Sequence, residues 1–381
     1  MPKICIIAHL NDLSGANKSL IDLAKGLSIN NEITVVVPRK GPLFDELRKN
    51  HINEKVILSG TWVYKKDESL IKKIIKRILN VFAEVKYYSF FKANNFDLIH
   101  YNSYTYGTGA VSAKKLNIPY TWHIRELPEE NFNLSFFNKK KSVRIISKSK
   151  CIITISKFMK QTLIDTFESK KIKVIYNGVV PISDKLPEIP CDCFSDIVII
   201  GAIAEDKGQL DAIRAIRYLH EMGHKFRLFI VGSVTDNEYY EKIKAEIIED
   251  IDSSIIFTGY KSNLKDYRKN TQIVLICSKA EAFGRVTIEA MNAGQIVIGA
   301  DKGATPEIIK DGYNGFLYKQ GDYIDLANRI KDVCYSADLN KISYNARETV
   351  NSCFSIKRTV NEVEKIMHFI IESRTKNDHR F

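Results

Sequence analysis

The segment EAFGRVTIEAMNAG begins at Glu281 and carries a second glutamate, Glu289, after seven intervening residues. It follows the apolar run QIVLIC (272–277), which predicts a buried strand, so Glu281 falls in the loop at the carboxyl end of that strand. Backbone amides at Gly284 and Arg285 would open the next helix, and helix N-termini bind anions such as phosphate. Because carboxylates accept strong hydrogen bonds from hydroxyl groups, the segment fits a site for a phosphorylated, polyhydroxylated ligand. The two glutamates also fit an acid/base pair, or an ordinary loop and helix surface.

A second candidate segment, GAIAEDKGQ (201–209), follows the predicted strand DIVIIG. Gly201 allows the backbone to approach a ligand closely. Lys207 stands near the start of the next helix, where a lysine can bind phosphate. A solvated surface lysine is the alternative interpretation.

Three further segments place small or polar residues directly after predicted strands. In HLNDLSGANKSL, Gly15 and Ala16 open a helix, but the segment matches neither the GxGxxG dinucleotide pattern nor the GxxxxGK[ST] phosphate loop. WHIRE ends a strand with His123 and Arg125, and a histidine suits polar chemistry near neutral pH, although a lone histidine is often structural. In KGATPEII, Thr305 stands at a helix start that can also form the edge of a site.

Short β-branched runs alternate with helix-length segments along the chain, which predicts an α/β fold with parallel sheets covered on both faces. The predicted strands are 3–8, 33–37, 55–58, 97–101, 120–123 and 151–155 in the first half, and 196–201, 226–232, 255–259, 272–277 and 295–300 in the second. A proline-containing stretch, 181–195, is predicted as a linker between a first domain, 1–180, and a second domain, 196–357. Ligands of doubly wound sheets bind at the carboxyl ends of the strands. The candidate residues are therefore expected to face a cleft between two domains.

The composition is that of a soluble globular protein, because 45% of the 381 residues are hydrophobic and 27% are charged. No apolar run approaches the roughly 18 residues of a membrane-spanning helix. The start, MPKICIIAHL, lacks the longer apolar region and the cleavage site of a signal peptide. The seven cysteines include one close pair, Cys191 and Cys193. Reduced thiols of a cytoplasmic protein are expected, with a metal site as the alternative.

The charge is distributed unevenly, since residues 1–180 contain 30 Lys and Arg against 15 Asp and Glu, a net charge of +15, whereas residues 181–381 carry −3. Such asymmetry indicates that the first half contacts something anionic. Within it, KKDESLIKKIIKRILNVF (65–82) is amphipathic, and KKKSVR (139–144) is a second basic run. A basic amphipathic helix can lie on an anionic membrane; the alternative is a helix that covers its domain. The apolar stripe consists of Leu70, Ile71, Ile74, Ile75, Ile78 and Leu79.

Together the candidate segments resemble the large retaining glycosyltransferase family 4, whose members have the GT-B fold of two Rossmann-like domains facing a cleft. The most specific part is the E-x7-E segment EAFGRVTIE, which continues as EAM-x-AG and is followed by G-x-TPEII. GAIAEDKGQ and YNGV (176–179) agree with the family in order and spacing. The likeness runs from the Gly15 loop to the C-terminal helix. It implies that the first domain binds the acceptor, that the second binds a nucleotide-sugar donor, and that the final helix, 358–381, crosses back onto the first domain.

The resemblance implies specific roles for residues of the second domain. Glu289 would bind the ribose hydroxyls of the donor, and Glu281 would hold hydroxyls of the transferred sugar. Lys207 would neutralise the diphosphate, the backbone of residues 283–285 would help to seat the sugar and diphosphate, and the turn at 259–260 would lie near the base.

From the first domain, Gly15 and His123 are implied to close over the donor sugar and the acceptor. The candidate catalytic residues are therefore Glu281, Lys207 and His123. The candidate donor-binding residues are Gly15, Ala16, Gly201, Gly259, Tyr260, Phe283, Gly284, Arg285, Val286, Glu289 and Thr305.

The family chemistry assigns the two glutamates as anchors for hydroxyl groups and not as an acid/base pair. A diphosphate leaving group needs charge neutralisation and no protonating acid, so neither a metal nor another cofactor is expected. Acceptor attack and donor departure would occur on the same face of the sugar, with the leaving phosphate oxygen taking the acceptor's proton. One position departs from the family: many members carry Arg where this chain has Ala202. Arg285 would then supply the second positive charge, or Lys207 and the helix N-termini would suffice.

The expected function is transfer of a sugar by a cytoplasmic protein that associates peripherally with the inner face of a bacterial membrane. UDP is favoured over GDP as the nucleotide of the donor. The acceptor would be a diphosphate-linked lipid or a growing polysaccharide. A nucleotide-sugar 2-epimerase, which needs no acceptor, and a non-catalytic sugar-nucleotide-binding protein are the alternatives. Nucleic-acid binding is not expected, because the basic residues are not interleaved with aromatic residues in a recognised module.

Overall fold

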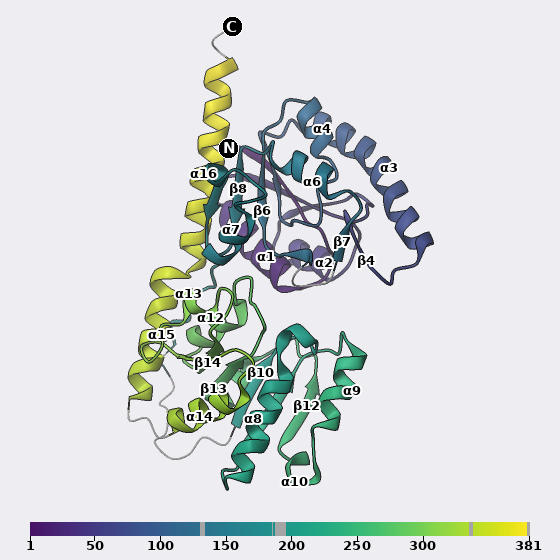
Figure 1. Cartoon of the computed structure of the whole chain (residues 1–381). Coiled ribbons are helices and arrows are strands. Elements are labelled where there is room, and N and C mark those ends of the chain that lie inside the picture. Colours follow the sequence, from purple (N-terminus) through teal and green to yellow (C-terminus); the bar gives the residue numbers. More distant parts are fainter. Residues whose placement is uncertain (130–133, 185, 187–195, 335–337, 379–381) are drawn as a thin grey trace. The chain divides into compact units, whose positions relative to one another are not determined.

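The computed structural model describes residues 1–129, 134–184, 186, 196–334 and 338–378. The chain forms two compact units, which we call unit 1 (Met1–Gly178 and Ile356–Phe381) and unit 2 (Val179–Ser355). Figure 1 shows unit 1 in purple and blue with the yellow C-terminal helix, and unit 2 mainly in green. Most of the linker expected at 181–195, including Cys191 and Cys193, lies outside the described residues.

Unit 1 contains a parallel sheet whose described strands follow the order β3-β2-β1-β5-β6-β8-β9. Its long β-branched runs are buried on both faces, as parallel strands covered by helices require. A short antiparallel pair, β4 and β7, stands apart from this sheet. The strands are β1 (Lys3–Ile7), β2 (Glu32–Val37), β3 (Asn53–Val56), β4 (Val63–Lys65), β5 (Leu98–Tyr101), β6 (Tyr120–Ile124), β7 (Leu134–Phe136), β8 (Cys151–Thr154) and β9 (Ile172–Val174).

The helices of unit 1 include the last helix of the chain, α16, which packs against the first, α1. Val363 and Met367 of α16 are completely buried in the same core as Ile4 and Ile6 of β1. The approach is close, because a Cβ added at Gly26 would lie 2.3 Å from a methyl carbon of Val360. The helices are α1 (Gly15–Leu27), α2 (Pro42–Lys49), α3 (Leu70–Asn94), α4 (Ala110–Lys115), α6 (Lys139–Ile146), α7 (Lys157–Leu163) and α16 (Ile356–Asp378), with a 3-10 turn at Ser169–Lys171.

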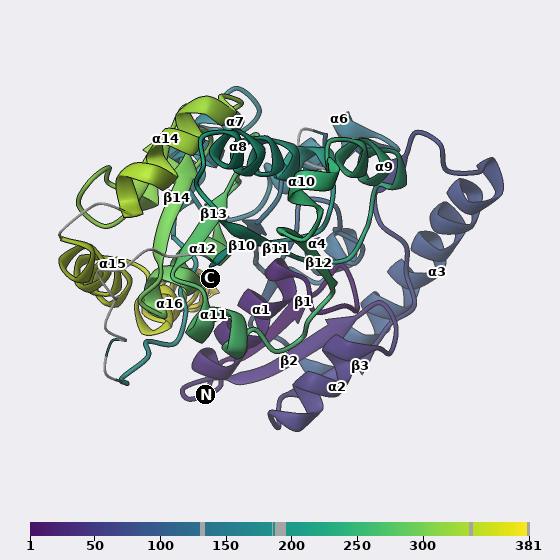
Figure 2. The same ribbon diagram turned by 90° about the horizontal axis from the view of Figure 1, so that it is seen from below.

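Unit 2 repeats this architecture with a parallel sheet in the order β12-β11-β10-β13-β14-β15. Helices α8 and α14 pack on one face, and α12 and α15 on the other (Figure 2). The strands are β10 (Asp196–Ile200), β11 (Arg227–Val231), β12 (Ile255–Gly259), β13 (Ile273–Ile276), β14 (Ile296–Ala300) and β15 (Phe316–Tyr318). The helices are α8 (Gln209–Glu221), α9 (Asn237–Ala245), α10 (Glu249–Asp252), α11 (Lys265–Asn270), α12 (Arg285–Asn292), α13 (Thr305–Ile308), α14 (Tyr323–Cys334) and α15 (Leu339–Cys353), with a 3-10 turn at Glu205–Lys207.

Both sheets are doubly wound, and the predicted α/β class is confirmed. In each sheet the chain starts in the interior, builds strands to one side, and then crosses to the other side. The strand order therefore reverses between β1 and β5 in unit 1 and between β10 and β13 in unit 2. Loops that leave the carboxyl ends of two such strands diverge and leave room for a ligand, so a site is expected at these two points.

Candidate functional site

The reversal point of unit 2 holds an ion pair formed by two of the candidate catalytic residues. Lys207 follows β10 and Glu281 follows β13, and these strands are hydrogen-bonded neighbours. Nζ of Lys207 lies 3.1 Å from Oε1 of Glu281 and 3.4 Å from Oδ2 of Asp206. The hydroxyl of Ser278 donates to the same oxygen of Glu281 over 2.6 Å. The sheet topology thus brings together residues that are far apart in sequence.

Two glycines fix the backbone on either side of this pair. Gly208 has a φ of 69°, and a Cβ there would lie 2.1 Å from the carbonyl oxygen of Cys277 at the end of β13. Gly303 has a φ of 65°, and its Cβ would lie 2.7 Å from the backbone nitrogen of Glu281. Only glycine adopts such angles without strain while allowing this approach. The Lys207 turn and the loop after β14 are therefore both held against the segment that carries Glu281.

The ion pair keeps both partners charged near neutral pH. Burial acts to raise the pKa of the Glu281 carboxyl, but Lys207 and the hydrogen bond from Ser278 outweigh it and hold that pKa below its usual range. Glu281 in turn raises the pKa of Lys207, against a smaller opposing effect of burial. The two side chains are 31% and 20% exposed, in the order Lys207 and Glu281. An accessible ammonium group of this kind can exchange part of its carboxylate contact for a ligand phosphate.

The second glutamate of the segment is held by two arginines. Nε of Arg285 donates to Oε1 of Glu289 over 2.8 Å, and Arg268 from α11 donates to Oε2. Burial raises the pKa of Glu289, but Arg285 and Arg268 outweigh it and keep that pKa below its usual range. An ionised carboxylate accepts hydrogen bonds and donates none. Glu281 and Glu289 are therefore both suited to anchor hydroxyl groups, and neither is protonated near neutral pH to act as an acid.

The surroundings of the two glutamates are open to a ligand at several backbone positions. Gly284, with a φ of 107°, precedes α12 and leaves the first amides of that helix without intrahelical partners. A Cβ added at Gly201 would meet no atom within 4 Å. Arg285, which the sequence offered as a substitute for the cation missing at Ala202, is already paired with Glu289. Lys207 is also paired, but its side chain is 31% exposed against 17% for Arg285, so the accessible positive charge at this edge comes mainly from Lys207 and the start of α12.

The remaining candidates of unit 2 lie in three different settings. Val286 is half-buried in the first turn of α12, and Phe283 is buried with its ring against Phe354. Thr305 is 1% exposed, and its methyl group packs against Gly299. Phe283 and Thr305 thus have buried side chains, which leaves mainly their backbone for ligand contacts. Gly259 is the last residue of β12, at the edge of the sheet, and Tyr260 follows it with an exposed side chain.

In unit 1, the candidate His123 is completely buried at the end of β6. Its Nδ1 lies 3.3 Å from Nη2 of Arg125. The other two nitrogens of that guanidinium donate hydrogen bonds to the side-chain oxygens of Asn102 and Asn177. Burial, with the charge of Arg125 and the ring of His100, lowers the pKa of His123 well below its usual value. The imidazole is therefore neutral near pH 7 and has no exposed surface. A catalytic role for His123 stays a prediction that requires the ring to become accessible.

Gly15 and Ala16 begin α1 at the carboxyl edge of the same sheet. Gly15 is exposed, and a Cβ there would meet no atom within 4 Å. Ala16 is half-buried, and its carbonyl oxygen accepts a long, 3.5 Å hydrogen bond from Asn102. The space beside Gly15 would admit a ligand, and the binding role of Gly15 and Ala16 stays a prediction.

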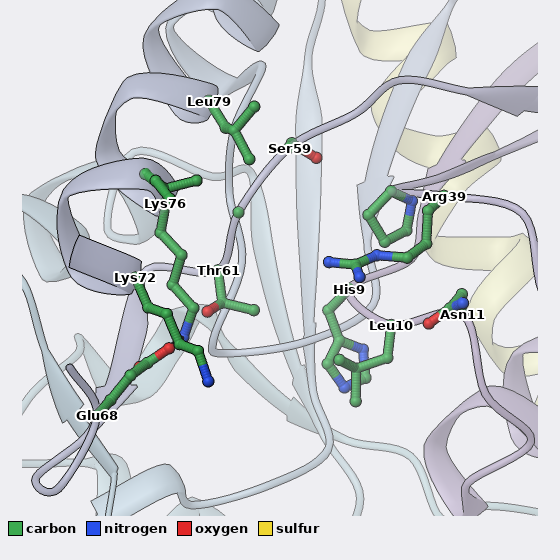
Figure 3. Close-up of a pocket in the computed structure, with 13 residues that line it drawn as sticks. His9, Leu10, Asn11, Arg39, Ser59, Thr61, Glu68, Lys72, Lys76 and Leu79 are labelled. Carbon is green, nitrogen blue, oxygen red and sulfur yellow. The ribbon is translucent and has the colours of Figure 1, made fainter.

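Unit 1 also contains a pocket of about 410 Å³ that the sequence did not predict (Figure 3). Arg39 extends into it from one side, and Lys72 and Lys76 of α3 line the opposite side. Lys76 is paired with Glu68 at 2.7 Å, whereas within the described residues the charged groups of Arg39 and Lys72 have no such partner. The remaining lining residues are His9, Leu10, Asn11, Pro38, Ser59, Gly60, Thr61, Glu68, Ile75 and Leu79. Two unpaired cations make the pocket suitable for an anionic group.

Sequence reasoning missed four residues that shape these sites. Arg268 has no local signal, because its partner Glu289 lies 21 residues away on another helix. Ser278 precedes Glu281 by three residues, a spacing at which a hydroxyl can bond back to a carboxylate. Gly208 could have been found as a glycine between a turn and a helix. Arg39 does not lie in any recognisable sequence motif.

The described residues contain neither a candidate metal site nor a helix that could span a membrane. In that part of the chain, no group of three or more His, Cys, Asp or Glu side chains is arranged to hold a metal ion. None of its helices is both long and apolar enough to cross a membrane.

The sequence matches two family models in succession. Residues 13–181 match the model described as Glycosyltransferase Family 4, and residues 195–349 match the model described as Glycosyl transferases group 1. The two matches fall in unit 1 and unit 2, and together they cover most of the chain.

Individual relatives agree with the family models. An uncharacterized glycosyltransferase of Methanocaldococcus jannaschii is 27% identical over 72% of this chain and 76% of its own length. The capsular polysaccharide biosynthesis glycosyltransferase CapM of Staphylococcus aureus is 24% identical over 59% of this chain and 63% of its own length.

Solved structures show the same fold at lower identity. A glycosyltransferase of Rickettsia africae superposes with a TM-score of 0.77 and 22% identity, covering 97% of this chain and 98% of that one. Anabaena HepE, solved with UDP and glucose, superposes with a TM-score of 0.76 and 20% identity, covering 97% of this chain and all of HepE. With its two doubly wound sheets and both family matches, the chain belongs to glycosyltransferase family 4 and has the GT-B fold.

Proposed function

We propose that the protein is a retaining glycosyltransferase that moves a sugar from a UDP-sugar to a lipid-linked or polysaccharide acceptor in the synthesis of a bacterial surface glycan. The observation that carries the proposal is the Lys207–Glu281 ion pair at the reversal point of the second sheet, beside the start of α12. A partly exposed cation and a helix N-terminus suit a diphosphate, and a fixed carboxylate suits sugar hydroxyls.

In the proposed reaction, an acceptor hydroxyl oxygen forms a bond to the anomeric carbon of the donor. The bond from that carbon to the β-phosphate oxygen breaks on the same face, and the departing phosphate oxygen takes the hydroxyl proton. Lys207 and the amides at Gly284 and Arg285 stabilise the negative charge that grows on the diphosphate. Glu281 and Glu289 accept hydrogen bonds from the sugar and the ribose. The positive charge that the reaction needs comes from the chain itself, so we expect metal-independent activity.

The choice of UDP is supported by solved relatives of the same fold. HepE was solved with UDP, with UDP and glucose, and with UDP-glucose, and Staphylococcus aureus TarM was solved with UDP. A role in surface glycans is supported by CapM and by a lipopolysaccharide N-acetylglucosaminetransferase of Salmonella typhimurium, which is 25% identical over 45% of this chain and 47% of its own length.

The basic first half supports an anionic acceptor at an anionic surface. Its net charge of +15 would favour association with the inner face of a bacterial membrane. The pocket with Arg39 and Lys72 offers unpaired cations for the acceptor in unit 1. In this arrangement the donor reaches unit 2 from the cytoplasm, and the acceptor reaches unit 1.

The proposal is tested by incubating the protein with UDP-sugars, with and without a membrane extract that supplies acceptors. Transfer that needs the extract, withstands EDTA and yields the same anomeric configuration as the donor by NMR is the expected result. A product formed from the donor alone would instead indicate an epimerase. Binding of UDP without any turnover would indicate a non-catalytic sugar-nucleotide-binding protein.

A further inference from the structure

Helix α3 buries one narrow face against the rest of unit 1 and exposes a wider apolar face to the outside. Its buried residues are Ala83, Tyr87 and Phe91, which pack against unit 1. The opposite arc of the helix consists of large apolar side chains that are exposed. They are Leu70 (71%), Ile71 (71%), Ile74 (46%), Ile75 (48%), Ile78 (49%), Val81 (68%), Phe82 (64%), Val85 (66%) and Tyr88 (37%), and we call this set the outer face of α3.

This result overturns one of the two interpretations left open by the sequence. The apolar stripe at 70–79 does not cover the domain, because most of its side chains point away from it. In both views α3 lies at the periphery of unit 1 (Figures 1 and 2). From Leu70 to Tyr88 the outer face extends for about 27 Å along the helix. Folded monomers rarely expose a continuous apolar surface of this kind unless it contacts a partner.

The charges beside the outer face are of one sign. Lys72, Arg77 and Lys86 are exposed on α3. The single acidic residue of the helix, Glu84, is turned toward the domain, where it accepts hydrogen bonds from the amides of Gly109 and Ser112 at 2.8 and 2.7 Å. A partner must therefore offer an apolar surface bordered by negative charge.

We propose that the outer face of α3 inserts into the boundary between headgroups and acyl chains of an anionic lipid monolayer. Helices that lie in this boundary combine a broad apolar arc with Lys and Arg at its borders. The basic side chains would remain among the anionic headgroups while Phe82, Val81 and Val85 enter the apolar layer. The helix lies along the surface and does not span the bilayer.

A second copy of the chain fits these features less well. Residues 71, 74, 78, 81, 85 and 88 follow the 3–4 spacing of a coiled coil. However, the apolar arc is wider than such a seam, and a second helix would bring another set of lysines and arginines against Lys72, Arg77 and Lys86. Coiled coils stabilise pairing with opposite charges at those borders, so like charges favour the lipid surface.

The pocket of unit 1 adjoins the same helix. Lys72 and Ile75 belong both to α3 near its outer face and to the lining of the pocket. A lipid that leaves its acyl chains in the monolayer could therefore place an anionic headgroup near Arg39 and Lys72. This part of the inference rests on the proposed function and names its acceptor as a lipid; the insertion of α3 does not depend on catalysis.

The test measures binding to vesicles without any sugar donor. Full-length protein is mixed with vesicles of phosphatidylcholine alone, or of equal parts phosphatidylcholine and phosphatidylglycerol, and separated by flotation. We expect binding to the anionic vesicles, and at least about tenfold weaker binding for Val81→Gln/Phe82→Gln/Val85→Gln. These positions are 64–68% exposed, so the variant is expected to fold, which circular dichroism checks. The matched control, Ile29→Gln/Ile248→Gln/Ile324→Gln, changes exposed apolar residues elsewhere and should bind like the natural protein.

Insertion is distinguished from adsorption by fluorescence. Phe82→Trp should be quenched by lipids brominated in the acyl chain, whereas the matched Ile29→Trp should not. Equal vesicle binding by the glutamine variant, or no quenching of Phe82→Trp, would overturn the inference. A dimer in solution that the glutamine variant dissociates would also overturn it, in favour of a second copy. Transfer to a water-soluble acceptor would be unaffected by any of these outcomes, so they leave the proposed function separately testable.

Discussion

The two sheets of the molecule share one topology but treat charge at their carboxyl edges in opposite ways. Unit 1 buries His123, Arg125 and Glu126 at the end of β6, where each is at most 8% exposed. Unit 2 leaves Lys207 and Glu281 partly exposed as an ion pair. Topology therefore decides where a site can form, and local burial decides whether its groups can meet a ligand.

The same contrast extends to helices. In α8 of unit 2 the apolar residues Ala212, Ile213, Ile216 and Leu219 are buried, as an amphipathic helix on a sheet requires. In α3 of unit 1 the larger apolar arc is exposed and a narrower one is buried. The distinctive feature of unit 2 is therefore an ion pair at the carboxyl ends of two strands. Those of unit 1 are an exposed apolar helix face and a pocket lined by two unpaired cations.

The largest expected effect is on turnover, and it distinguishes the partly exposed Lys207–Glu281 ion pair from ordinary surface pairs. Lys207→Ala should lower kcat by about 10²–10³-fold, or 3–4 kcal/mol, because the departing diphosphate loses its nearest side-chain cation. Initial rates with a saturating donor measure the effect. Lys279→Ala is the control, since Lys279 pairs with Glu205 in the neighbouring loops and both are more than half exposed. Similar rates for both variants would remove Lys207 from the site.

The buried histidines predict that unit 1 is the more acid-sensitive half. Burial lowers the pKa of His100 to about 3 and that of His123 well below its usual value. Below pH 6.5 the unfolded chain binds protons that the folded unit does not, so stability falls as pH falls. Each histidine removes about 1.4 kcal/mol at pH 5.5, or about 3 kcal/mol together. The depressed pKa values of Glu281 and Glu289 reduce the stability of unit 2 only below about pH 4.5.

Tryptophan fluorescence separates the two halves, because both tryptophans, Trp62 and Trp122, lie in unit 1. During acid titration the fluorescence transition should precede the loss of far-ultraviolet circular dichroism, which reports both units. Coincident transitions below pH 4.5 would contradict the predicted order.

A smaller effect, on the stability of unit 2, is expected from substituting Gly208, the glycine that follows Lys207. Gly208→Ala should destabilise unit 2 by about 2 kcal/mol more than Gly223→Ala. Both positions have positive φ, but only at Gly208 would the new Cβ collide with a backbone carbonyl, whereas nothing lies within 4 Å at Gly223. Urea unfolding of the two variants gives the difference. Equal losses would mean that backbone strain alone matters and that the contact with Cys277 does not.

The smallest predicted effect concerns donor affinity. Glu289→Gln should weaken UDP-sugar binding about tenfold, or 1.4 kcal/mol, because an amide accepts hydrogen bonds from ribose less strongly than a carboxylate. Glu246→Gln is a matched control: Glu246 also pairs with two arginines, Arg214 and Arg217, and is similarly buried, on the α9 side of the unit. Calorimetric titration compares them. If both variants bind the donor equally well, Glu289 has only a structural role.

Much of the fold could be predicted from the sequence because most of its strands consist of short runs rich in β-branched residues. The eleven strands expected from those runs agree with the structure to within a few residues. The short strands β4, β7, β9 and β15 were not predicted, because three residues carry too little periodicity to be recognised. The return of α16 to unit 1 was implied by the family resemblance and has no signal in the pattern of the helix itself.

Residues of the candidate site could be predicted only where they come directly after a predicted strand. Lys207 and Glu281 were found because each lies after an apolar run, and the parallel sheet then places them together. Arg268 and the pocket around Arg39 depend on contacts between distant segments, which spacing does not encode. The outer face of α3 shows a further limit: periodicity reveals an apolar stripe, but it does not say whether a core or an external surface receives it.

The most direct test of the account is to titrate UDP and uridine into the natural protein and into Lys207→Ala by calorimetry. The proposed function assigns the diphosphate to Lys207 and the ribose to Glu289. It therefore predicts that the natural protein binds UDP much more tightly than uridine and that the variant loses most of this preference while its binding of uridine is retained. An undiminished preference for UDP in the variant, or no binding of UDP by the natural protein, would contradict the assignment of unit 2 as the donor site.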